Sequence, residues 1–251
     1  GLLTLNDASS YSGTTIITDG SIIAGVDNVF ANSVLNIAGA TARFEMETTN
    51  QRIAGLAGNG VVSNDEPGAN PVTLTIDGGG GQTFSGTFFD NTADDISVVK
   101  TGAGAQTFSV GAATFAGDLT IDDGTLSITT ANGLGEAAKG TVVEGNGTLN
   151  LNNLSLASLE VIEISGSGIG NIGALTATGT SSIAASNTLL MGADATIGGG
   201  GTLTLLTVLD NDGARARTKT GSGTLILAAD NSASQIACTS ASESECPCSP
   251  V

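Results

Sequence analysis

The sequence contains no histidine and no tryptophan, and it has only one tyrosine. Without histidine, the chain has neither the base of Ser-His-Asp and Cys-His catalytic sites nor the commonest ligand of zinc. Proteolysis by these routes is therefore excluded. The shortage of aromatic rings also counts against polysaccharide-cleaving enzymes, because substrate pockets are commonly lined by aromatic side chains.

Positive charge is equally scarce. The chain carries 7 lysines and arginines against 24 acidic residues, which gives a formal net charge of -17. A surface of this sign repels the phosphate backbone that dominates nucleic-acid affinity, so we expect no nucleic-acid partner. The acidic residues are scattered along the chain, which indicates solvated turns. No stretch approaches the ~20 apolar residues of a membrane-spanning helix, so the chain as given is not expected to span a membrane.

Cysteine is confined to the end of the chain, at Cys238, Cys246 and Cys248. A long body without thiols fits an extracellular protein with a separate terminal device. Because a single residue separates Cys246 from Cys248, a direct bridge between them is awkward, and the simplest pairing joins Cys238 to one of the two. The remaining thiol is then available for a cross-link between chains. A tail with incidental cysteines is the alternative, and the sequence leaves both open.

Glycine and short alternating strands make up much of the rest. The chain has 37 glycines, and segments such as 72–76, 159–164 and 201–205 alternate aliphatic with polar residues before a turn residue. This period of two is typical of half-buried strands. Three segments, 1–20, 100–128 and 219–232, repeat one order of features: a glycine turn, a short strand, a polar turn and a second strand. Such internal repetition indicates a repeat architecture.

The pattern predicts an all-β protein, a parallel β-helix (β-solenoid), over residues 1–231, followed by a cysteine-containing tail over 232–251. A narrow solenoid core is filled by small and branched aliphatic side chains, as this composition provides, and no two-residue hairpin turn between long strands supports an antiparallel β-sandwich. At roughly 20 residues per coil and ~4.8 Å between coils, we expect about a dozen coils and a rod of ~60 Å.

The third repeat reads Lys-Thr-Gly-Ser-Gly-Thr-Leu-Ile-Leu-Ala-Ala-Asp-Asn-Ser from Lys219 to Ser232, and it resembles the passenger-associated strand repeat of bacterial autotransporters. Residues 1–20 resemble the same repeat with its usual Tyr-Ser-Gly-Thr-Thr continuation, and 100–128 are similar to a more diverged copy. Residues 53–64 are similar to a segment that often precedes a repeat in that family. The resemblance implies a right-handed β-helix exported across the envelope, in which the repeat aids folding and the function, often adhesion or aggregation, lies elsewhere. The cysteine-containing ending departs from the family.

The remaining candidates for chemistry are acidic turns. A glycosidase needs two carboxylates on either side of a sugar, and the candidates for this role are Asp94, Asp95, Asp122 and Asp123. Acidic turns also offer oxygen ligands to calcium, although no EF-hand loop is present, and the sequence does not decide whether calcium binds. We expect no catalytic residues, no cofactor and no metal site, and we keep the four aspartates for the enzymatic alternative only.

Two further groups of side chains have a structural and a binding interpretation. Five phenylalanines are expected to stack inside the coils, with an exposed adhesive patch as the alternative; they are Phe84, Phe88, Phe89, Phe108 and Phe115. The basic cluster is expected to be a solvated loop, with docking to an acidic neighbour as the alternative; it consists of Arg215, Arg217 and Lys219.

The sequence therefore predicts a non-catalytic extracellular protein, secreted or on a bacterial cell surface, which acts as a stiff stalk or fibre subunit. Because the open ends of a solenoid present unpaired strand edges, self-association end to end into a homo-oligomer or fibre is expected. A host-cell, matrix or neighbouring-cell surface is the other expected partner. A carbohydrate-active β-helix enzyme, either a polysaccharide hydrolase or a lyase, is the alternative function.

Overall fold

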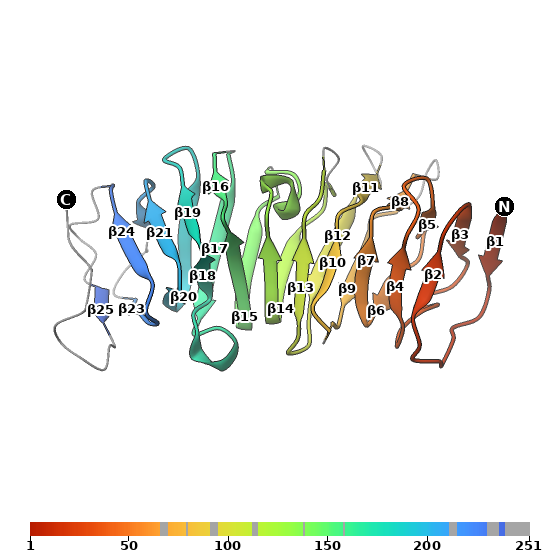
Figure 1. The fold of residues 1–251 in the computed structure, drawn as a ribbon, viewed down its shortest axis with the longest axis horizontal. Helices are drawn as coiled ribbons and strands as arrows, with labels where there is room; N and C mark the ends of the chain where they lie inside the picture. The colour runs from red at the N-terminus through yellow and green to blue at the C-terminus, as the bar shows by residue number, and fades with distance from the viewer. Residues whose placement is uncertain are drawn as a thin grey trace.

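The computed structural model of the chain is an all-β solenoid of about nine turns, whose strands lie side by side along one long axis (Figure 1). It describes residues 1–65, 70–78, 80–90, 95–111, 115–137, 139–157, 159–210, 215–229 and 236–238, with only the backbone described at 210 and 236–238. The strands follow one another along the axis in chain order, which confirms the predicted β-solenoid. Within the described ranges, no helix is long and apolar enough to cross a membrane.

Most of the described strands are short. The first half contains β1 (Leu2–Leu5), β2 (Thr15–Ile17), β3 (Ser21–Ala24), β4 (Val34–Ile37), β5 (Arg43–Glu45), β6 (Gln51–Ile53), β7 (Gly55–Gly58), β8 (Val61–Asn64), β9 (Val72–Ile76), β10 (Gln82–Phe84), β11 (Thr87–Asp90), β12 (Ile96–Lys100) and β13 (Ala105–Phe108). The second half contains β14 (Leu119–Ile128), β15 (Thr141–Asn152), β16 (Ser155–Leu156), β17 (Val161–Gly166), β18 (Leu175–Thr178), β19 (Thr180–Ile183), β20 (Thr188–Gly199), β21 (Thr202–Leu205), β22 (Leu209–Asp210), β23 (Arg217–Lys219), β24 (Thr224–Leu227) and β25 (Ile236–Cys238). Two 3-10 turns, η1 (Ala131–Leu134) and η2 (Ile169–Asn171), complete the described elements.

The described strands form three parallel sheets. One sheet has the order β1-β3-β5-β8-β11, and another has the order β16-β19-β21-β24. The third and largest sheet follows the path β2-β4-β7-β10-β13-β14-β15-β17-β20-β23-β25, with further strands paired beside it. It is this large because the long strands turn a corner of the coil: the first part of β14 pairs with β12 and its second part pairs with β13, and the register shifts between Ile121 and Asp123.

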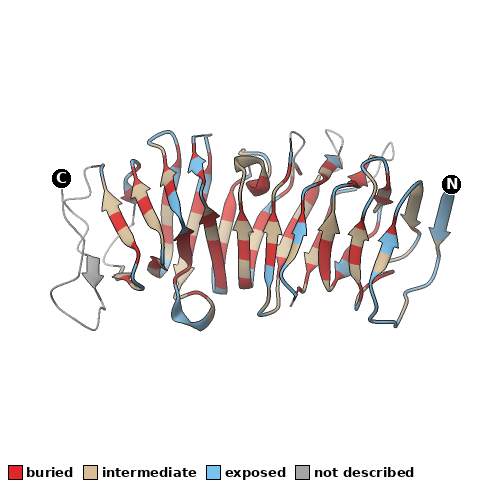
Figure 2. Ribbon diagram, viewed as in Figure 1, coloured by how far each residue is buried: buried red, intermediate tan, exposed pale blue. Residues whose placement is uncertain are grey.

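The core consists of ladders in which the same inward position of each coil carries an apolar side chain. In β9 the side chains of Val72, Leu74 and Ile76 are buried and the intervening threonines are half-exposed, as an alternating strand requires. The register stacks Leu126, Leu149, Leu175 and Ile197 directly above one another, and all four are buried. Figure 2 shows buried bands recurring across the strands of successive coils. Each buried side chain of this kind contributes about 1.5–3 kcal/mol.

The coils are longer than predicted, which is why about nine turns replace the expected dozen. Leu2 pairs with Ser21, 19 residues further on, which is close to the predicted spacing. Thr87, however, pairs with Val61, and Leu175 pairs with Leu149; both steps take 26 residues. The extra residues lie in the loops between strands, so the strand register is kept while the number of coils falls.

The phenylalanine cluster lies in the core, with one exception. Phe84, Phe88, Phe108 and Phe115 are fully buried, and the ring of Phe88 meets the other three edge-on at centroid distances of 5.4, 5.7 and 5.2 Å. This confirms the expectation of stacking inside the coils. Phe89 is different, because it is 48% exposed and faces the guanidinium of Arg43 at 5.7 Å. A single exposed ring does not make the alternative adhesive patch.

The predicted tail, residues 232–251, contains the last described strand. Strand β25 falls within 232–251 and pairs in parallel with β23, Arg217 opposite Ile236 and Lys219 opposite Cys238. Cys246 and Cys248 lie outside the described residues, and only the backbone of Cys238 is described. The cysteine pairing and the division into body and tail therefore stay predictions.

Candidate functional site

The structure does not bring the two aspartate turns together. Asp95 precedes strand β12, and its carboxylate pairs with the ammonium of Lys139 at 3.0 Å. Asp122 and Asp123 lie past Ile121, the partner of Lys100 at the opposite end of β12. Five to six residues of extended chain separate the turns, roughly 15–20 Å. This span exceeds the separation of about 5–9.5 Å that glycosidase carboxylates need. Asp94 lies outside the described residues.

Asp122 and Asp123 are both accessible to solvent. The side chain of Asp122 is exposed, whereas the Oδ1 atom of Asp123 accepts a hydrogen bond from the neighbouring Gly124 amide at 2.8 Å. Among the described residues, no three histidine, cysteine or acidic side chains gather in a way that could hold a metal ion. The acidic turns as the structure describes them are solvated corners of the coil.

A lysine occupies a position in the apolar core. Lys100 pairs with Ile76 on one side and Ile121 on the other, and its side chain is fully buried. Its ammonium donates hydrogen bonds to the carbonyl oxygens of Thr101 and Gly102 at 2.5 and 2.6 Å and to that of Asp123 at 3.1 Å. Burial lowers the pKa of Lys100, while the charges of Asp123 and Asp77 act in the opposite direction. The lysine thus ties the turn of one coil to the next coil.

The third repeat places a lysine in the same way. Lys219 stacks on Ile197, is buried, and donates to the carbonyl oxygens of Thr220 and Gly221 at 2.8 and 2.9 Å. Gly221 has a φ of +74°, which only glycine adopts readily. The Lys-Thr-Gly sequence is therefore a turn closed by its own lysine. The expectation of a solvated basic loop was wrong for Lys219, and also for Arg217, which is buried.

Glu160 is a second buried ionisable group. It is 3% exposed, and its carboxylate accepts a hydrogen bond from the hydroxyl of Thr141 at 3.4 Å. Its backbone amide donates to Oδ1 of Asn187. Burial raises the pKa of Glu160 to about 7, against the smaller opposing effect of the Thr141 hydrogen bond. Because its partners Thr141 and Asn187 both belong to the coils, we assign Glu160 to the packing of the coil.

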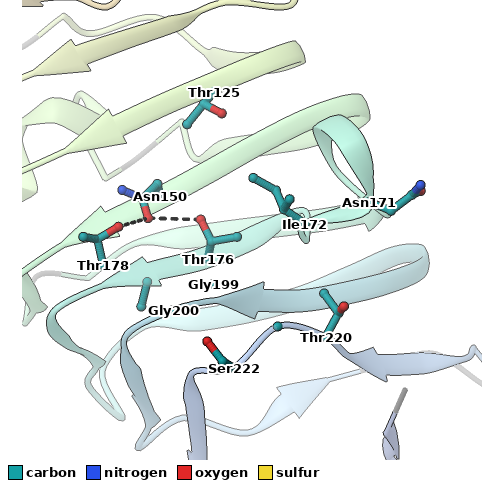
Figure 3. Close-up of a pocket in the computed structure, with 12 residues that line it drawn as sticks. Thr125, Asn150, Asn171, Ile172, Thr176, Thr178, Gly199, Gly200, Thr220 and Ser222 are labelled. Carbon is teal, nitrogen blue, oxygen red and sulfur yellow. Dashed lines mark hydrogen bonds between the residues drawn. The ribbon is translucent and has the colours of Figure 1, made fainter. Parts of the chain in front are cut away.

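A hollow of about 530 Å³ lies on the outer surface of the largest sheet (Figure 3). We call it the outer groove. Its volume falls within the range of small-ligand sites. Twelve residues from five successive coils line it: Thr125, Asn150, Asn171, Ile172, Thr176, Ala177, Thr178, Gly199, Gly200, Thr220, Gly221 and Ser222.

An amide and hydroxyl ladder forms one side of the outer groove. Oδ1 of Asn150 accepts hydrogen bonds from the hydroxyls of Thr176 and Thr178, each at 3.1 Å, as Figure 3 shows. The side-chain amide nitrogen of Asn150 donates to Ser127 on the preceding coil at 3.0 Å. Because these partners fix the amide, the orientation of the neighbouring hydroxyls is also fixed.

A loop over residues 166–173 forms the opposite wall. The buried hydroxyl of Thr148 donates to the carbonyl of Gly173 at 2.8 Å and accepts from the amide of Ile169 at 3.1 Å, which pins the loop on the sheet. Gly198 lies beneath the loop, where a Cβ atom would come within 1.9 Å of the carbonyl oxygen of Ile172. The glycine allows the loop to approach the sheet, and it leaves the Ile172 side chain 47% exposed at the groove.

Three segments of the chain match the family described as the passenger-associated transport repeat: residues 1–24, 98–128 and 218–234. No curated protein and no solved structure matches the chain. The fold alone defines a parallel β-solenoid repeat protein. Two of its turns are closed by the buried lysines Lys100 and Lys219. The three matched repeats and the β-solenoid together support an autotransporter passenger β-helix. The repeat family implies secretion or display at the cell surface.

Proposed function

We propose that this passenger is a non-catalytic rod with a structural or adhesive role outside the cell. The observation that carries the proposal is the stacked core, in which one inward ladder of Leu126, Leu149, Leu175 and Ile197 runs through four successive coils. A core of this kind makes the molecule stiff because each coil packs on both neighbours. The separation of Asp95 from Asp122 also supports a role without catalysis.

Self-association end to end is the second part of the proposal. In the 251-residue chain used for the test below, strand β1 pairs only with β3 among the described strands, and its other edge carries unpaired backbone groups. Its side chains Leu2 and Leu3 are 67% and 52% exposed. An exposed strand edge with apolar side chains favours pairing with another chain.

Electron microscopy of the 251-residue chain at low and high concentration tests the proposal. We expect separate straight rods at low concentration and end-to-end fibres at high concentration. Rods that never lengthen would limit the protein to a spacer or a binding stalk. Compact particles would contradict the proposal that the chain forms a rod.

The enzymatic alternative has its own test. A panel of acidic and neutral polysaccharides is incubated with the chain, and released sugar is measured. We expect no release. Release that disappears in an Asp122→Asn, Asp123→Asn double variant would instead assign a polysaccharide hydrolase or lyase to this rod.

A further inference from the structure

We propose that the outer groove is a binding site for uncharged carbohydrate, such as a segment of a neutral glycan chain. This inference deepens the adhesive role proposed above and rests on it. The groove combines a volume suited to one or two sugar rings with a polar lining and a wall held in place by hydrogen bonds. We take in turn its charge, its hydrogen-bonding groups and its apolar surface.

The first argument is the charge of the lining. None of the twelve lining residues is acidic or basic, although the chain has 24 acidic residues and a net charge of -17. An uncharged groove has no counter-charge for a phosphate, sulfate or carboxylate, and the overall negative potential of the protein repels such groups. A cation likewise finds no carboxylate in the lining. The ligand that fits is polar and neutral.

The second argument is the kind of polar group on offer. Hydroxyls and amides both donate and accept, which is the hydrogen-bonding character of sugar hydroxyls. The exposed Thr178 donates its hydroxyl proton to Asn150, so its oxygen lone pairs remain as acceptors. Within the described part of the chain, the hydroxyls of Thr220 and Ser222 have no recorded protein partner, and they are available to donate or accept.

The third argument is the apolar surface between these groups. Gly199, Gly200 and Gly221 present bare backbone, and a Cβ atom added at Gly200 would meet nothing within 4 Å. The half-exposed Ile172 stands beside this floor (Figure 3). A sugar ring has C–H faces as well as hydroxyl edges, so it matches a floor of backbone with one aliphatic wall. A purely polar ion does not.

The lining of the groove contains no aromatic ring, and this limits the affinity that we expect for a sugar. Stacking on aromatic rings adds binding energy that this groove cannot supply. We therefore expect weak binding by one chain, in the millimolar range. Many chains on one surface would bind a glycan-coated surface much more tightly, because a second contact forms at a high effective concentration.

The test fills the groove without straining the backbone. In Gly200→Gln the new side chain projects into the open space at Gly200, whose backbone is not in the left-handed region. Gly13→Gln is the matched control, because Gly13 also has open space around its Cβ position and lies far from the groove in the sequence. Saturation-transfer NMR then measures contact with a panel of neutral oligosaccharides and with their sialylated counterparts.

We expect neutral oligosaccharides to give a transfer signal with the native chain and with Gly13→Gln, and at least a fivefold weaker signal with Gly200→Gln. The double variant Thr220→Val, Ser222→Ala, which removes hydroxyls with little change of shape, should weaken the signal in the same direction. Three results would each overturn the inference: no signal from any neutral sugar, an undiminished signal in Gly200→Gln, or signals from the sialylated sugars only. Rods and fibres seen by microscopy would then still support the proposed function, since that readout does not depend on sugars.

Discussion

At the scale of single residues, the lysine of the repeat is the clearest link between sequence and fold. Lys100 stands in an aliphatic ladder, yet its ammonium reaches three carbonyl oxygens of two adjacent coils. The carbonyls of Thr101 and Gly102 lie past the end of β12, outside the strand ladder. Leaving a buried acceptor unpaired costs about 1–3 kcal/mol. The free-energy cost of burying the lysine is offset because its ammonium bonds three carbonyl oxygens at once.

Replacement of Lys100 by methionine keeps the shape of the stem and removes the ammonium. We expect Lys100→Met to lower the free energy of unfolding by about 2 kcal/mol, because lost hydrogen bonds outweigh the gain from a less polar core. Urea unfolding followed by circular dichroism measures the change. Lys139→Met is the control, since Lys139 makes a surface ion pair with Asp95 and should hardly matter. If Lys100→Met left the free energy of unfolding unchanged, the stabilising role of the Lys100 ammonium at this turn would be refuted.

Glu160 makes the stability of the rod depend on pH. Its folded-state pKa of about 7 lies above its ordinary value of 4.5. The contribution of the protonated carboxyl is therefore complete below pH 4.5 and is lost as the pH rises through 7. We expect the urea midpoint of the native chain to fall between pH 5 and pH 8 and that of Glu160→Gln to fall less. Glu144→Gln, on an exposed side chain, controls for the lost charge; equal pH dependence in both variants would contradict this assignment.

At the scale of the elements, the alternation of apolar residues predicted the strands, and the internal repetition predicted their stacking into a solenoid. Val72–Ile76 is an example, because its apolar residues are in one phase only. For residues 159–164 the sequence does not decide which side faces the core, since Leu159 and Val161 are in one phase and Ile162 and Ile164 are in the other. Pairing of Ile162 and Ile164 with Leu189 and Met191 decides the phase, which turns Glu160 inward and leaves Leu159 exposed.

The position of Lys100 was predictable in principle, whereas the outer groove was not. In Ile-Ser-Val-Val-Lys, the lysine is in phase with Ile96 and Val98, and this phase indicates an inward side chain. The corresponding lysine of the third repeat, Lys219, follows two arginines, and this concentration of charge favoured the solvated loop that the structure contradicts. The groove depends on residues far apart in the sequence, from Thr125 to Ser222, and on a loop held by Thr148. No local pattern encodes such an arrangement.

The phenylalanine cluster is expected to be the most sensitive packing element. Phe88 contacts three other rings across successive coils, so Phe88→Ala should lower the free energy of unfolding by about 3–5 kcal/mol through the cavity that it leaves. Phe89→Ala, at the exposed neighbour, should change it by less than about 1 kcal/mol. Thermal unfolding of both variants provides the comparison. A similar loss in the two would mean that ring burial does not control stability here.

At the scale of the whole molecule, stability should vary along the rod. Central strands such as β14 and β15 pair on both sides, whereas β1 pairs with β3 alone in the described sheets. In a linear array of coils, opening is easiest where a coil has one neighbour. Hydrogen–deuterium exchange of the 251-residue chain should therefore show fast exchange in β1 and the slowest exchange in β14 and β15. Uniform protection would indicate a single cooperative unit.

The uneven loops between coils have a consequence for the growth of such molecules. Steps of 18 and of 27 residues both keep the strands in parallel pairing, as the pairs Arg43 with Val61 and Val161 with Thr188 show. Insertions can thus accumulate in a loop without disturbing the coils on either side. Duplication of a whole coil, by contrast, extends the rod by about 4.8 Å. Reach and surface detail can therefore evolve independently, the first by adding coils and the second by remodelling loops.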